Sequence, residues 1–186
     1  MIRHLALCCL CMAVTGCADN SSRYLIDAPA ASTKAKVRVA TLEVRDVSLP
    51  AYAAALEIAL QEEGGALHNL ADTLWGDEPV RGVTGAIARN LDIATTATVA
   101  ASPWPLEEPP QAQLDIRIER MLARDDATFE LSGQYAIASP EGVIRERLER
   151  FDIRIPLVST EPAGIVAATG LAIAELGKQV SRTLAR

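Results

Sequence analysis

The stretch QAQLDIRIER, residues 111–120, decides the fold class of this 186-residue chain. Its apolar and polar residues alternate, and a period of two is typical of a β-strand with one buried and one solvated face. The apolar positions are Ala112, Leu114, Ile116 and Ile118. The pattern predicts a strand whose one face lies on the core and whose other face meets water.

Two later segments alternate in the same way. Residues 129–137 read FELSGQYAI, and residues 143–155 end in Phe151, Ile153 and Ile155. Pro140-Glu141-Gly142 between them is a turn signal. We expect the three segments to form an antiparallel meander. Its charged outer side chains should pair across the strands, and they are Arg117, Glu119, Glu130, Arg145, Arg147 and Glu149.

Two helices are expected on the buried face. Residues 162–184 predict the longer one, with an apolar stripe at Ile165, Ala168, Ala172, Leu176 and Val180. A second helix should begin near Pro79, where the missing N–H is tolerated, with Asp77 as its cap. Its apolar face consists of Val80, Val83, Ile87 and Leu91.

The segment between residues 53 and 70 allows two interpretations. Helix propensity alone favours a helix over AAALEIAL, residues 53–60. Gly64-Gly65 between two short apolar runs is instead a hairpin signal, because tight hairpin turns need positive φ. We therefore predict a hairpin of residues 56–62 with residues 66–70.

Shorter strands complete the expected sheet. They are predicted at residues 24–26, at residues 36–47 with a slip in the alternation, and at residues 98–101, with loops at 28–34 and 102–110. The elements together predict one α/β domain. It has a mixed, mostly antiparallel sheet with two main helices packed on it.

The N-terminus has the layout of a secretory signal. Arg3 precedes an uncharged apolar run, and the run ends in AVTGC, residues 13–17. A buried helix is the alternative, but a run at the N-terminus with a basic flank favours export. Val14-Thr15-Gly16-Cys17 resembles a bacterial lipobox, so we expect residues 1–16 to be removed. Residues 17–22 would form a lipidated tether, and residues 23–186 the periplasmic domain.

Cys17 is then the acylated first residue, carrying a diacylglycerol and an N-acyl chain, and no other cofactor is expected. Cys8, Cys9 and Cys11 leave with the leader, so the mature chain cannot form an internal disulfide. Ala18, rather than an aspartate, follows the cysteine. This favours sorting to the outer membrane, with the domain on its periplasmic face.

The charge balance excludes some partners. The chain has 18 Lys and Arg against 24 Asp and Glu, a net charge of −6. Nucleic-acid binding normally requires a basic surface, so we expect no nucleic-acid partner. A broad electrostatic attraction to anionic lipid is equally disfavoured, and membrane attachment would depend on Cys17.

Catalytic and metal-binding motifs are missing from the sequence. His68 is the one histidine after the leader, so a His/Cys zinc set is absent. Adjacent carboxylates fall in loops, where they are usually solvated; a glycosidase pair is the open alternative. No phosphate loop or nucleophile elbow is present. We therefore expect neither an enzyme nor a metal site.

The two tryptophans have two interpretations. Trp75 and Trp104 both lie in loop-like segments. Each either covers an edge of the core or belongs to a partner-facing surface, where tryptophan is enriched.

The order of these features resembles a known family. A lipobox is followed by Tyr24-Leu25-Ile26, Val37-x-Val39 and Leu49-Pro50-x-Tyr52. Trp75 precedes the first long helix, Pro103-Trp104 follows it, and a C-terminal helix closes the domain. This order resembles the ABC-type transport auxiliary lipoproteins, the group that includes paraquat-inducible protein C. The Trp75-Gly76-Asp77 step departs from the Trp-Ala-like step usual in that family.

The resemblance implies a non-enzymatic outer-membrane lipoprotein with a fold similar to the N-terminal domain of TolB, of the anticodon-binding-domain-like type. Such proteins dock the distal end of an MCE-domain protein that spans the periplasm and moves lipids between the membranes. They can also form homo-oligomeric rings. The partner-binding candidates are Leu49, Pro50, Tyr52, Trp75 and Trp104.

Two non-enzymatic alternatives remain open at this point. The protein could be a carrier that holds acyl chains itself, which requires an apolar cavity between sheet and helix. It could also be an envelope assembly factor, a TolB-like interaction module.

Overall fold

The strand with the clearest alternation is the centre of the sheet. The computed structural model describes residues 20–186, and in it β6 (Ala112–Arg124) pairs along its length with β7 (Thr128–Ala138). β7 in turn pairs with β8 (Arg147–Pro156), and both pairings are antiparallel. The other edge of β6 is shared by two strands. β2 (Thr41–Val44) lies parallel to its beginning and β3 (Glu57–Gln61) parallel to its end.

The remaining strands extend the sheet at its edges. β4 (Leu67–Trp75) forms an antiparallel hairpin with β3, and β1 (Ser22–Tyr24) lies parallel to the last residues of β4. β5 (Thr98–Ala101) lies parallel to β2. The antiparallel ladders are long and the parallel ones short. The prediction of a mixed, mostly antiparallel sheet is therefore confirmed.

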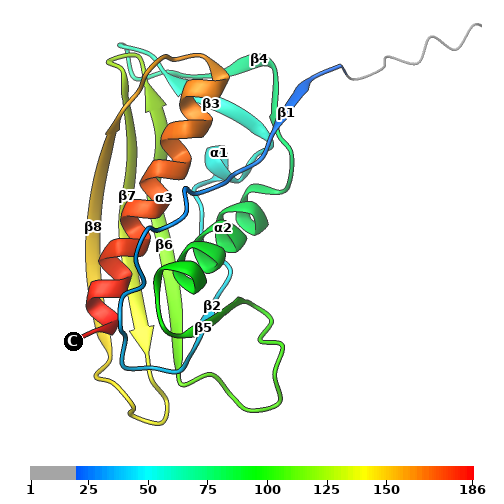
Figure 1. The fold of residues 1–186 in the computed structure, drawn as a ribbon. Coiled ribbons are helices and arrows are strands. Elements are labelled where there is room, and N and C mark those ends of the chain that lie inside the picture. The colour runs from blue at the N-terminus through cyan, green and yellow to red at the C-terminus, as the bar shows by residue number, and fades with distance from the viewer. Residues whose placement is uncertain (1–19) are drawn as a thin grey trace, which may run out of the picture.

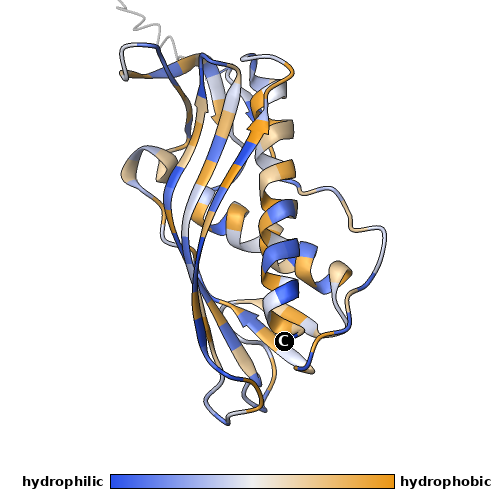
Figure 2. Ribbon diagram, turned by 90° about the vertical axis from the view of Figure 1, so that its left-hand side faces the viewer, coloured by the Kyte–Doolittle hydropathy of each residue, from blue (hydrophilic) through white to orange (hydrophobic). Residues whose placement is uncertain are grey.

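Two helices cover one face of this sheet, as predicted (Figure 1). They are α2 (Pro79–Ala94) and α3 (Pro162–Leu184), while α1 (Ala51–Ala54) is a single short turn. The whole predicted stripe of α3 is buried, and so are the apolar residues of β6 that face it. Along the long strands, hydrophobic and hydrophilic positions alternate (Figure 2). The core therefore lies between the meander and α3.

Residues 25–38, here called the strap, run across both helices without regular structure (Figure 1). Ile26 is buried, and the side-chain amide of Asn90 on α2 donates a hydrogen bond to the Pro29 carbonyl at 3.2 Å. Two backbone bonds fix the far end of the strap, from Ala35 N–H to the Ala94 carbonyl and from Arg38 N–H to the Leu184 carbonyl. The strap thereby ties the N-terminal segment to the ends of α2 and α3.

The strap corrects two of the predicted strands. The first strand is Ser22–Tyr24 rather than residues 24–26, because Ile26 is buried against α2 instead of in the sheet. The strand predicted over residues 36–47 is limited to Thr41–Val44. Val37 N–H donates to the Thr96 hydroxyl and Ala40 N–H to the Gln111 side chain. These bonds replace a strand ladder, which explains the slip in the alternation.

Three local expectations have different outcomes. The hairpin is confirmed, but β4 continues to Trp75 instead of ending at residue 70. The short helix α1 was not expected. The N-cap of α2 is Glu78 rather than Asp77, and the Asp77 carboxylate accepts hydrogen bonds from Glu78 N–H and from the Arg81 side chain in the first turn. The signal peptide and Cys17 lie outside the described residues.

Candidate functional site

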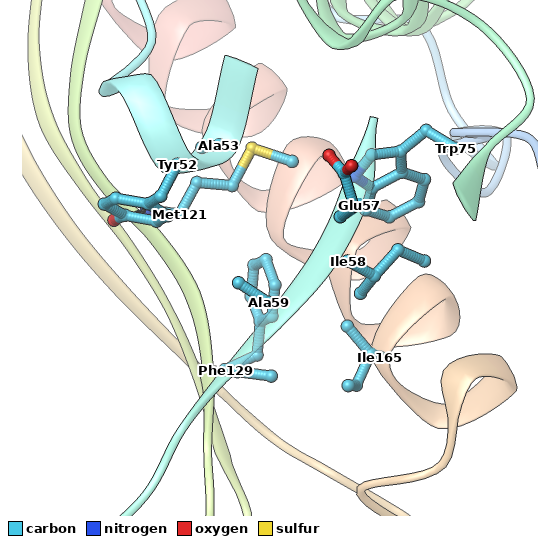
Figure 3. Close-up of a pocket in the computed structure, with 10 residues that line it drawn as sticks. Tyr52, Ala53, Glu57, Ile58, Ala59, Trp75, Met121, Phe129 and Ile165 are labelled. Carbon is cyan, nitrogen blue, oxygen red and sulfur yellow. Dashed lines mark hydrogen bonds between the residues drawn. The ribbon is translucent and has the colours of Figure 1, made fainter. Parts of the chain in front are cut away.

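The interior between sheet and helices is almost filled. One small cavity lies where α1, β3, β6, β7 and α3 meet, and its volume is about 20 Å³ (Figure 3). That is room for about one water molecule, whereas small-molecule sites usually measure about 300–1,000 Å³. Its walls include Tyr52, Met121, Phe129 and Ile165. This cavity is therefore too small for an acyl chain.

Four of the five partner-binding candidates gather around α1. Leu49 and Pro50 lead into this helix, Tyr52 lies on it, and Trp75 faces the same small cavity as Tyr52 (Figure 3). The Tyr52 hydroxyl accepts a hydrogen bond from Met121 N–H at 3.3 Å. Tyr52 also borders a surface groove of about 270 Å³ beside the exposed Leu67. The surface side of this cluster is a concave, partly apolar site next to the β3–β4 hairpin.

Trp75 itself is not part of that surface. Its side chain is 5% exposed and packs in the core at the end of β4. The sequence placed it in a loop because glycine and aspartate follow directly, but β1 pairs with β4 up to this residue and extends the strand. Of the two interpretations of Trp75, the one in which the side chain covers the core agrees with the structure.

Trp104 lies apart from the other candidates. It is half-buried in the loop after β5, and β5 lies at the opposite end of the molecule from the β3–β4 hairpin (Figure 1). Its indole N–H donates to the Glu108 carbonyl at 2.8 Å, so the side chain folds back on its own loop. The structure thus separates Trp104 from the cluster around α1.

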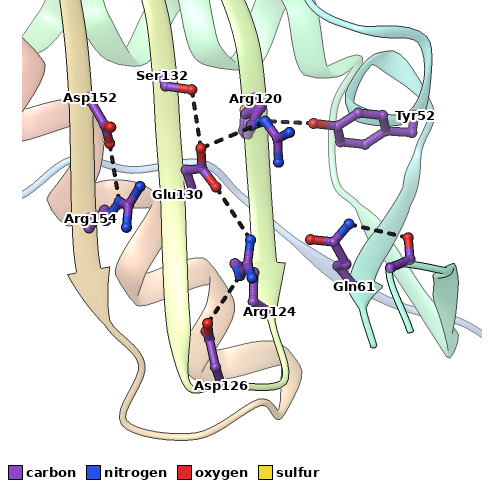
Figure 4. A network of polar contacts seen from close by, with 11 residues as sticks. Tyr52, Gln61, Arg120, Arg124, Asp126, Glu130, Ser132, Asp152 and Arg154 are labelled. Carbon is purple, nitrogen blue, oxygen red and sulfur yellow. Dashed lines mark hydrogen bonds and ion pairs between the residues drawn. The ribbon is translucent and has the colours of Figure 1, made fainter. Parts of the chain in front are cut away.

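The uncovered face of the meander carries paired charges. Glu130, 8% exposed, lies 3.7 Å from both Arg120 and Arg124, and Arg124 also contacts Asp126 at 3.2 Å (Figure 4). Glu119 on β6 pairs with Arg150 on β8 at 3.7 Å. Of the six charged residues expected to pair across the strands, Glu119 and Glu130 do so, whereas Arg117 pairs with Asp115 on its own strand. These pairs place both signs of charge next to one another on this face.

The other ionisable groups do not form a catalytic arrangement. His68 is exposed on the hairpin, 3.4 Å from Glu62. Arg81 hydrogen-bonds Asp77 and holds the pKa of that carboxyl below its ordinary value. Within residues 20–186, no three His, Cys, Asp or Glu side chains come together in a way that could hold a metal ion.

One surface was missed by the sequence reasoning. A groove of about 350 Å³, here called the basic groove, lies between the strap, the end of α2 and the last turns of α3. Its lining residues are Ala31, Ser32, Thr33, Lys34, Ala35, Ala94, Lys178, Ser181, Arg182 and Ala185. Two short basic runs, KAKVR at residues 34–38 and the end of α3, were its only signal in the sequence. Nothing in the sequence places those two runs together.

Comparison with known proteins identifies the family. The family model of the ABC-type transport auxiliary lipoprotein component matches residues 24–181. The chain belongs to this family. The resemblance noted in the sequence is confirmed, and the auxiliary lipoprotein is a membrane-associated protein of the cell envelope. A search of curated proteins found no significant match.

Solved structures share the fold of this chain. The auxiliary lipoprotein resembles the crystal structure of an uncharacterized protein with a TM-score of 0.66 and 15% identity, over 82% of this chain and 99% of the other. It resembles a protein from Xanthomonas campestris with a TM-score of 0.62 and 15% identity, over 88% and 92% of the two chains. These likenesses show the fold alone. Within residues 20–186, no helix is long and apolar enough to cross a bilayer.

Proposed function

We propose that the auxiliary lipoprotein is anchored in the outer membrane through acylated Cys17 and docks an MCE-domain protein of an ABC-type lipid transport system. The observation that carries the proposal is the family match over residues 24–181. The leader that ends in Val14-Thr15-Gly16-Cys17 supports the anchor. The role is that of a binding partner, without an enzymatic step.

The filled core favours a docking role over a role as a lipid carrier. A carrier needs a cavity for acyl chains, and the space between the sheet and α3 measures about 20 Å³. Lipid would therefore move through the partner, while this protein holds the partner's distal end at the membrane. Docking by several copies in a ring would strengthen the attachment through multivalency.

The proposed contacts are on the surface around α1, formed by Leu49, Pro50 and Tyr52, and on the loop that carries Trp104. Both offer partly exposed apolar side chains beside short loops. Loss of partner binding in Tyr52→Ala or Trp104→Ala would identify which one is used. If both variants bind like the wild type, neither surface is the contact.

The test is to purify the lipidated protein from separated membranes in mild detergent and to identify the proteins and lipids that accompany it by mass spectrometry. We expect an acylated Cys17 in the outer-membrane fraction and a stoichiometric MCE-domain protein. Cys17→Ser is the control and should leave the protein unanchored. Tightly bound phospholipid without a partner would instead indicate a carrier, and envelope assembly proteins would indicate an assembly factor.

A further inference from the structure

The basic groove concentrates positive charge on an acidic protein. Lys34 comes from the strap, and Lys178 and Arg182 come from the end of α3. Lys178 has a carboxylate partner, Glu175, at 3.0 Å. Within residues 20–186, neither Lys34 nor Arg182 has a carboxylate within ion-pair distance. In a chain with a net charge of −6, such a cluster needs a reason.

The end of a helix explains only part of this cluster. A cation in the last turn of α3 is favourable because the helix C-terminus carries partial negative charge, and Arg182 occupies that position. Arg38 also donates a hydrogen bond from Nη1 to the Arg186 carbonyl at 2.7 Å. Arg182 and Arg38 are therefore explained by the helix end, and Lys178 is paired with Glu175, so Lys34 is the charge that remains without an explanation.

Part of the groove is lined by small apolar side chains. Alanines at positions 31, 35, 94 and 185 line it, and hydroxyls of the strap and α3 lie beside them. Small side chains allow a peptide backbone to approach closely, and the basic rim suits carboxylates on either side of that backbone. A volume of about 350 Å³ fits a few residues of an extended chain.

The position of the groove decides between two kinds of anionic partner. β1 lies beside the beginning of α2, and the groove lies at the end of that helix. Sixteen helical residues rise about 24 Å, so the groove is that far from the segment that follows the anchor. β1 lies at one end of α2, and the end of α2 that borders the groove is the other (Figure 1). With the membrane on the β1 side, as the proposed function has it, the groove lies on the far side of the domain, which favours a soluble protein segment over lipid headgroups.

We propose that the basic groove binds an acidic, extended segment of a protein partner. The inference rests on the proposed function for its orientation relative to the membrane, and it adds a second contact to those around α1 and Trp104. The segment lies along the alanines, with its carboxylates at Lys34, Lys178 and Arg182.

The test uses the purified mature protein and a fluorescein-labelled hexapeptide of alternating alanine and glutamate, measured by fluorescence anisotropy. We expect saturable binding that weakens as salt is raised, because exposed charges are screened. Lys34→Glu should weaken binding by about tenfold or more, since it reverses a rim charge. Arg45→Glu makes the same charge change at an exposed position outside the groove, and it should bind within about twofold of the wild type.

Several results would overturn the proposal. Equal affinity of Lys34→Glu and Arg45→Glu would show a general charge effect. Binding to phosphatidylglycerol vesicles without binding to the peptide would show a lipid site. If Lys34→Glu still co-purifies with the full amount of the MCE-domain partner, the partner does not dock at the basic groove. The proposed transport role would then stand without this contact. Lys34 lies in an exposed part of the strap, and circular dichroism of the variant verifies that it folds.

Discussion

Gly170 determines how closely the strap can approach α3. A Cβ atom at this position would overlap with the carbonyl oxygen of Asp27, so an alanine would push the strap away from the helix. The sequence shows this residue only as a glycine in a helix, where it lowers helix propensity. The structure explains why a glycine is needed here, because the strap passes directly against α3 at this position.

We expect Gly170→Ala to lower the free energy of unfolding by about 1–3 kcal/mol, the usual range for overpacking. The matched control is Gly64→Ala in the hairpin turn, where no atom lies within 4 Å of the new Cβ. Urea denaturation followed by circular dichroism measures both. Similar losses in the two variants would show that close packing at Gly170 is unimportant.

Tyr135 forms a buried hydrogen bond at the end of the core. Its hydroxyl lies 2.8 Å from the Thr183 hydroxyl on α3, and burial raises the pKa of the phenol above its ordinary value. Tyr135→Phe should cost about 1 kcal/mol near neutral pH, the usual contribution of one hydrogen bond. Thermal unfolding of the two proteins tests this value.

The same residue predicts a pH dependence. Because the pKa is raised in the folded state, the stabilisation is complete below pH 10.0 and is lost as the pH rises through the raised value. The stability difference between wild type and Tyr135→Phe should therefore shrink above that pH. A difference that stays constant into the alkaline range would contradict the raised pKa.

At the scale of elements, α3 matches its sequence prediction at both ends. Its stripe packs on the meander because the apolar residues recur at helical spacing, and the strands opposite show a period of two. Such long periodic segments are predictable because each residue's environment follows from its neighbours. The hairpin was predictable for the same reason, since its turn needs glycine.

Substitution of two leucines on α3 distinguishes the contribution of core packing to stability from that of helix propensity. Leu176 is fully buried, and Leu176→Ala should lower the free energy of unfolding by about 2–5 kcal/mol. Leu171 is 48% exposed on the same helix, so Leu171→Ala should cost clearly less. Chemical denaturation compares the pair. Equal costs would mean that α3 does not pack on the sheet as described.

Short elements were less predictable. β1, β2 and α1 have three or four residues each, too few for a period to show. Their limits are set by partners distant in sequence, such as the Gln111 side chain that binds Ala40 N–H. The prediction that Trp75 lies in a loop was wrong for a related reason. β4 reaches this residue because it pairs with β1, and the sequence of β4 itself does not show that pairing.

At the scale of the whole molecule, the candidate site was predicted only in part. The cluster around α1 follows from adjacent residues, Leu49 to Tyr52. The basic groove lies between the strap and the end of α3, two segments that the Arg38–Arg186 hydrogen bond joins across 148 positions. Single-sequence patterns contain no information on such contacts, so this surface was visible only in the fold.

The filled core makes a prediction for the complete protein. The purified mature protein should not bind a dansyl-labelled fatty acid in a saturable way, because its internal cavity measures about 20 Å³. Dansyl fluorescence during titration tests this, with serum albumin as a positive control. Stoichiometric, saturable binding would show that the sheet and α3 can separate to admit a ligand.

The strap also sets the path of mechanical load. Any tension on the N-terminus reaches β1 first, which has three residues paired with β4. From there it passes into a segment fixed at Asn90, Ala94 and Leu184, along the length of two helices. These attachments would be loaded together in shear instead of being peeled one by one. A pull between a membrane tether and a docked partner would therefore be borne first by the β1–β4 pairing and then by α2 and α3, before the rest of the sheet is strained.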